Sequence, residues 1–117
     1  MAGVTGAGLA STLAGLAAEA GGTHVRTSGG STTWSRGDAT FAVLRGASIE
    51  LRLDAAVAAA ALRTPDTARS ERGPEWVRYA PSTLEGHDLD RLTAWFGLAH
   101  KRAGQAATRA PTARAPA

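Results

Sequence analysis

Four arginines and a tryptophan lie close together in the second half of the sequence and are the residues best suited to bind a ligand. They are Arg63, Arg69, Arg72, Trp76 and Arg78. A guanidinium group beside an indole ring can hold a carboxylate, a phosphate or an aromatic anion. The nearby acids Asp66, Glu71 and Glu75 could instead neutralise these arginines as surface ion pairs. The pattern therefore leaves two interpretations open, an anion-binding site and a charged surface loop.

The other residues that could do chemistry do not form a reaction centre. His24, His87 and His100 fall on a predicted strand, a loop and a helix end, and only His87 has acids close by, at Asp88 and Asp90. Acids in that position suit the positive N-terminal end of a helix without a metal. The sequence contains no Cys, no Gly-x-Ser-x-Gly elbow and no Ser-x-x-Lys pair. We therefore expect no catalytic residue, no metal and no cofactor.

The basic charge of the chain is concentrated at its C-terminal end. Residues 101–117 carry Lys101, Arg102, Arg109 and Arg114 with no acid, whereas residues 1–100 contain nine Arg and ten Asp or Glu. The formal net charge of +3 thus divides into +4 for the end and −1 for the body. Because a protein that binds duplex DNA concentrates basic groups on its folded body, this distribution predicts at most weak nucleic-acid binding.

A change of hydrophobic period separates helical from extended segments. Alternation of period two predicts strands over residues 23–27, 32–36, 40–45, 48–53 and 75–79. In the fourth of these, Ile49, Leu51 and Leu53 point one way and Glu50 the other, which is typical of an antiparallel sheet with one wet face. In the last, Trp76 and Arg78 share the face opposite Val77 and Tyr79.

Three helices are expected, over residues 9–20, 54–63 and 88–102. In the third, Leu89, Leu92, Phe96 and Ala99 form an apolar stripe, which Trp95 widens. We expect Trp76, Trp95 and Phe96 to be interior neighbours that fix this helix across the sheet. The interval 66–73 is read as a charged loop.

These elements predict an α+β fold with an antiparallel sheet of about five strands and helices packed mainly on one face. The length fits a single domain, which we place at residues 1–103. Residues 104–117 consist of Ala, Pro, Arg, Thr, Gln and Gly and are expected to be a disordered basic tail. The apolar N-terminal segment is diluted by Gly, Ser and Thr, so no membrane span is expected.

The second half of the chain resembles the luciferase-domain family of small bacterial proteins. The similarity rests on Phe41-Ala42-Val43, Glu50-Leu51-Arg52-Leu53, Arg63-Thr64-Pro65-Asp66, Arg72-Gly73-Pro74-Glu75-Trp76-Val77 and Leu92-x-x-Trp95-Phe96-x-x-Ala99-His100. The chain is also similar to MmcQ/YjbR-like proteins, which implies a DNA-binding-like architecture. The luciferase name would imply oxidative chemistry, but the Gly-His-x-His element of part of that family is absent and no reactive residue carries over.

The first expectation is therefore a small cytoplasmic, non-catalytic bacterial domain that binds a partner protein or a small anionic ligand. One alternative is an MmcQ/YjbR-like nucleic-acid-binding protein, and another is an oxidoreductase, as the luciferase name implies. The sequence does not determine the oligomeric state, and the edges of a small sheet leave dimerisation open.

Overall fold

The computed structural model describes residues 4–114, with side chains described for residues 4–105. Its elements, in chain order, are α1 (Gly6–Ala20), β1 (His24–Ser28), β2 (Ser31–Arg36), β3 (Ala39–Arg45), β4 (Ser48–Arg52), α2 (Ala55–Ala61), β5 (Thr67–Arg69), β6 (Trp76–Tyr79) and α3 (Gly86–Arg114). The expected α+β class is confirmed. The sheet has six strands rather than about five, because β5 forms inside the segment that was expected to be a loop.

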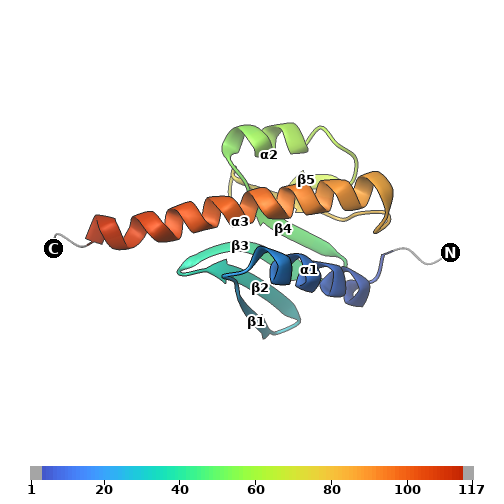
Figure 1. Ribbon diagram of the computed structural model, residues 1–117. Helices are drawn as coiled ribbons and strands as arrows, with labels where there is room; N and C mark the ends of the chain where they lie inside the picture. Colours follow the sequence, from blue (N-terminus) through green and yellow to red (C-terminus); the bar gives the residue numbers. More distant parts are fainter. Residues whose placement is uncertain (1–3, 115–117) are drawn as a thin grey trace.

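All neighbouring strands pair antiparallel, in the order β1-β2-β3-β4-β6-β5. The β1–β2 connection is a two-residue turn in which Gly29 and Gly30 have φ values of 57° and 81°. Positive φ at both central positions defines a type I′ turn, whose twist matches that of the flanking strands. Figure 1 shows the resulting sheet with β1 at one edge, far from α2.

The helices pack on one face of the sheet. Figure 1 shows α1 and α3 lying across the same side of the strands, and α3 contacts β2, β3 and β4. The contact of Thr67 with α2 places this helix on the same face. Thr67 is the cross-strand partner of the core residue Tyr79, so its side chain points to the core face, where it donates a hydrogen bond to the carbonyl oxygen of Ala61 in α2. We call the sheet face opposite the helices the open face. Its central row, defined by the register, is Arg26, Thr33, Val43, Glu50 and Arg78.

The aromatic core differs from the expectation. Phe96 is buried and packs edge-to-face on Phe41, with ring centroids 5.4 Å apart, and on Trp34 at 6.3 Å. Trp95 packs on Tyr79 at 5.0 Å. The prediction that Trp76 joins Trp95 and Phe96 in the interior is wrong, since Trp76 is half-buried and paired with Arg52, on the strand face away from Val77. Trp34 takes its place in the core.

The third helix is longer than expected. It continues through Gly104 to Arg114, past the predicted end near Arg102. Gly104 is explained by packing, because a Cβ there would collide with the guanidinium group of Arg36, which donates a hydrogen bond to the carbonyl oxygen of His100 at 3.1 Å. Disorder of residues 104–117 stays a prediction, and residues 115–117 lie outside the described residues.

Candidate functional site

The turn that follows β5 is held to the open face by Glu50. Its Oε2 accepts a hydrogen bond from Ser70 Oγ at 2.6 Å, and its Oε1 accepts one from Arg72 Nε at 2.9 Å. Partial burial opposes ionisation of Glu50, but the hydrogen bonds from Ser70 and Arg72 and the charges of Arg72 and Arg45 outweigh it, so the pKa of Glu50 is lowered. Glu50 is therefore an ionised anchor for this turn.

Arg72 is further fixed by the indole ring of Trp76. The guanidinium carbon of Arg72 lies 5.4 Å from the ring centroid, within cation–π range. Arg72 thus contacts a carboxylate and an aromatic face within the protein, so its guanidinium group already has partners. The side chain of Trp76 is thereby oriented at the start of β6.

Beside this turn lies a groove of about 350 Å³ between α2 and the start of β6. Its lining residues are Ala55, Ala59, Leu62, Arg69, Ser70, Gly73, Pro74 and Trp76. The alanines of α2 give the groove room, because a helix face of methyl groups leaves space that larger side chains would fill. We call it the α2 groove; its size is at the lower end of the range for small-ligand sites.

The structure brings together only part of the arginine cluster predicted from the sequence. Arg69 and Trp76 line the α2 groove, and Arg72 stacks on Trp76 without lining the groove. Arg63 follows α2 in an exposed turn and does not line the groove. Arg78 is exposed on the open face, where it pairs across the strands with Glu50 and Ala68. The five residues thus divide between two surfaces and an isolated turn.

The predicted local neutralisation is found for Arg72 alone, and its partner is not one of the expected acids. Glu75 instead holds Arg52 and Arg102, and Asp66 accepts a hydrogen bond from Ser82. Within residues 4–105, neither Arg69 nor Arg78 has a carboxylate at ion-pair distance. These two arginines are therefore available to an external anion.

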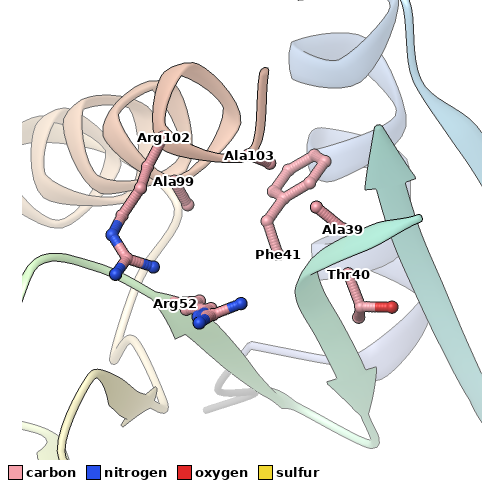
Figure 2. A pocket seen from close by; sticks show the side chains of 7 residues that line it. All are labelled: Ala39, Thr40, Phe41, Arg52, Ala99, Arg102 and Ala103. Carbon is pink, nitrogen blue, oxygen red and sulfur yellow. The ribbon is translucent and has the colours of Figure 1, made fainter. Parts of the chain in front are cut away.

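A second concave feature lies under α3, where Figure 2 shows Arg52 and Arg102 beside Phe41. The cavity measures about 10 Å³, enough for one water molecule at most. Arg102 binds Asp54 at 2.9 Å and Glu75 at 2.8 Å, and Arg52 binds Glu75 at 3.2 Å. The charges are locally balanced and connect α3 to the sheet, so this cluster is a structural tie.

The open face carries five arginines, and sequence reasoning singled out only two of them, Arg72 and Arg78. The other three are Arg26, Arg45 and Arg52, and Glu50 is the acid of the same rows. Arg26, Arg45 and Arg78 are exposed, and no side chain in the described range 4–105 forms an ion pair with them. Strand alternation combined with hairpin register would have placed them on one face.

Of the histidine and acids at the start of α3, Asp88 has a structural role. Asp88 accepts hydrogen bonds from Thr83, from Arg91 at 2.9 Å and from the Tyr79 hydroxyl at 3.1 Å. Burial opposes ionisation of Asp88, but these donors outweigh it and lower its pKa, while burial raises the pKa of Tyr79. No cluster of three metal-ligating side chains occurs among the residues whose side chains are described.

No described helix is both long enough and apolar enough to cross a bilayer. Comparison of the chain with protein-family models, with curated proteins and with solved structures yields no match.

Proposed function

We propose that this protein is a small non-catalytic domain of the luciferase-domain type that binds a small anionic ligand in the α2 groove. The ligand has an apolar or aromatic body and a single acidic group. The main support is the position of Arg69. It lines an apolar groove beside Trp76 and has no carboxylate partner in residues 4–105.

The division of charge and apolar surface within the groove supports this ligand class. Ala55, Ala59 and Leu62 offer methyl groups on one wall, and the Trp76 ring offers a flat face on the other. A carboxylate or sulfonate at the Arg69 end can accept two parallel hydrogen bonds from one guanidinium group. Arg72 does not compete with Arg69 for the anion, because Arg72 is already paired with Glu50.

The test uses the dye 1-anilinonaphthalene-8-sulfonate, whose aromatic rings and sulfonate group match the groove. Its fluorescence is titrated against the full chain, and competition by benzoate and octanoate is then measured. We expect Arg69→Gln to weaken dye binding about tenfold, since a hydrogen bond to a charged group contributes about 1.5–3 kcal/mol. Trp76→Phe should weaken it less.

Arg63→Gln is the matched control, because Arg63 is a neighbouring exposed arginine that lies outside the groove. It should leave dye binding unchanged, and both variants should keep the thermal midpoint of the parent chain. Equal weakening by Arg63→Gln and Arg69→Gln would mean that the dye senses net charge alone. That result would remove the α2 groove as the ligand site.

A second candidate function is nucleic-acid binding of the MmcQ/YjbR-like kind, favoured by the unpaired arginines of the open face. Arg26 and Arg78 lie on one row, four strand spacings apart, or about 19 Å at about 4.8 Å per strand. A small anion cannot reach both, whereas an extended polyanion can. Residues 1–100 are nearly neutral in total, so their net charge does not reveal these two exposed arginines.

Fluorescence anisotropy with labelled single-stranded oligothymidylate tests this second candidate. Replacing Arg26 and Arg78 together by Glu should reduce affinity at least tenfold and lower the slope of log K against log salt by about 1.4, because two phosphate contacts are lost. Arg63→Glu is the control for net charge. If it weakens binding as much per charge removed, the open face is not the nucleic-acid interface.

A further inference from the structure

The edge strand β1 has backbone groups that no other strand uses. Ser28 and Ser31 flank the two-residue turn and are cross-strand partners, so they form a hydrogen-bonded pair. Hydrogen-bonded and non-hydrogen-bonded pairs alternate in an antiparallel ladder. The N–H and C=O groups of Val25 and Thr27 therefore point away from β2, toward the free edge of the sheet.

The side chains of β1 are also uncovered. All five residues of the strand are exposed, and Val25 keeps 58% of its surface accessible. Val25 pairs with Trp34, a core residue, so Val25 is the continuation of the helix-covered apolar surface at the edge. At the opposite edge, β5 has only three residues. β1 thus offers the longer template for a further strand.

Arg26 determines what kind of strand can pair there. It lies between Val25 and Thr27, so on the free edge it occupies a non-hydrogen-bonded position, where facing Cα atoms are only about 4.5 Å apart. If two copies paired antiparallel with β1 centred on itself, Arg26 would face Arg26 of the second copy, and like charges in direct opposition destabilise a strand pair. The same position favours a carboxylate on the incoming strand.

We propose that β1 accepts an extended segment of a partner protein, with one central acidic residue, as an additional antiparallel strand. The segment has a Glu or Asp opposite Arg26, flanked by β-branched apolar residues opposite Val25 and Thr27. Backbone hydrogen bonds to Val25 and Thr27 supply affinity, and the charge opposite Arg26 supplies selectivity. This surface is at the other end of the sheet from the α2 groove.

The experiment uses two labelled peptides, acetyl-Lys-Thr-Val-Glu-Val-Thr-Lys-amide and its counterpart with Lys in place of Glu, and measures anisotropy with the full chain. The parent chain should bind the Glu peptide about fivefold more tightly than the Lys peptide, as expected for opposite against like charges across a strand pair. Arg26→Glu should reverse this preference. Arg45→Glu, on the open face but two strands inward, should leave it unchanged.

Two further outcomes would overturn the proposal. One is equal binding of both peptides, or binding of neither, by the parent chain. The other is sedimentation of the parent chain as a dimer that Arg26→Glu dissociates, because a second copy would then occupy the edge.

Thr27→Pro separates backbone pairing from charge. It removes an outward N–H that β2 does not use, so peptide binding should be lost while the β1–β2 hairpin is retained.

Discussion

The ion pair between Glu50 and Arg72 should be one of the larger polar contributions to stability, and a double-mutant cycle can measure it. The side chain of Glu50 is 14% exposed and that of Arg72 is 35% exposed, so the pair is less screened than an ordinary surface pair. Exposed pairs contribute about 0.2–1 kcal/mol, and hydrogen bonds to charged groups about 1.5–3 kcal/mol. Because Arg72 remains about a third exposed, we expect a coupling free energy of about 1 kcal/mol.

Arg72→Ala should cost more than this coupling, because it also removes the contact with Trp76. Adding about 0.5 kcal/mol for an exposed cation–π contact gives a loss of about 1.5 kcal/mol. With a urea m-value of about 1.5 kcal/mol/M, the unfolding midpoint should fall by about 1 M. Arg78→Ala is the matched control, an exposed arginine on the same open face, and its expected change in unfolding free energy is within about 0.5 kcal/mol.

The coupling between Glu50 and Arg72 should depend on pH, and its value at neutral pH decides whether the reasoning holds. The folded-state pKa of Glu50 is lowered from its ordinary value of 4.5. Its contribution is therefore complete above that value and is lost as the pH falls through the folded-state pKa. Urea unfolding of the parent, Glu50→Gln, Arg72→Ala and double-variant chains should give coupling at neutral pH that declines under acidic conditions. Coupling below about 0.3 kcal/mol at neutral pH would show that Arg72 does not hold the turn.

Three further changes test the packing of the fold, each by urea unfolding. Phe96→Ala should cost about 3–5 kcal/mol, because it empties the centre of the aromatic core; a loss below about 1 kcal/mol would contradict that position. Gly6→Ala places a Cβ 2.8 Å from a carbonyl oxygen in the β3–β4 turn and should cost about 1–3 kcal/mol, whereas Gly15→Ala has open space and should stabilise by about 0.5–1 kcal/mol. Arg102→Gln should cost about 1 kcal/mol through its two carboxylate partners, and exposed Lys101→Gln should be nearly neutral.

Alternation of side chains predicted most of the sheet, and its failures have physical causes. The β4 pattern of Ile49 and Leu51 inward against Glu50 outward is found as expected. β5 was missed because three residues are too few to show a period. Thr67 to Arg69 are extended only because β6 pairs with them and because the Ala80 amide donates to the carbonyl oxygen of Asp66.

The error on Trp76 shows that parity constrains a strand more strongly than residue type does. Val77 and Tyr79 are buried. Because successive side chains of a strand point to opposite faces, Trp76, which precedes Val77, could not share their face. Its size made it a core candidate, but register excludes it. Trp34 was overlooked because its strand neighbours are Thr and Ser, and nothing in a polar strand shows which residues the helices will cover.

The candidate site was only partly predictable, because closeness in sequence did not give closeness in space. Arg69 and Arg78 are on adjacent strands, but Arg69 pairs with Val77 and Arg78 with Ala68, so the two arginines leave the sheet on opposite faces. Arg63 lies in the turn between α2 and β5 and is on neither strand. A cluster spaced over a turn and two strands divides between faces as soon as the register is set.

Net charge also gave an incomplete account of the surface, for a reason that the ion pairs make clear. Asp54 and Glu75 lie next to the ends of helices and strands, where they hold Arg52 and Arg102 and so tie elements together. Asp88 holds Arg91 within α3. Carboxylates used in this way neutralise arginines inside the structural framework and leave others without a partner among residues 4–105. A body with nearly equal numbers of acids and bases can therefore present positively charged surfaces, at the α2 groove through Arg69 and on the open face. Which arginines are left over depends on the register and cannot be obtained from composition.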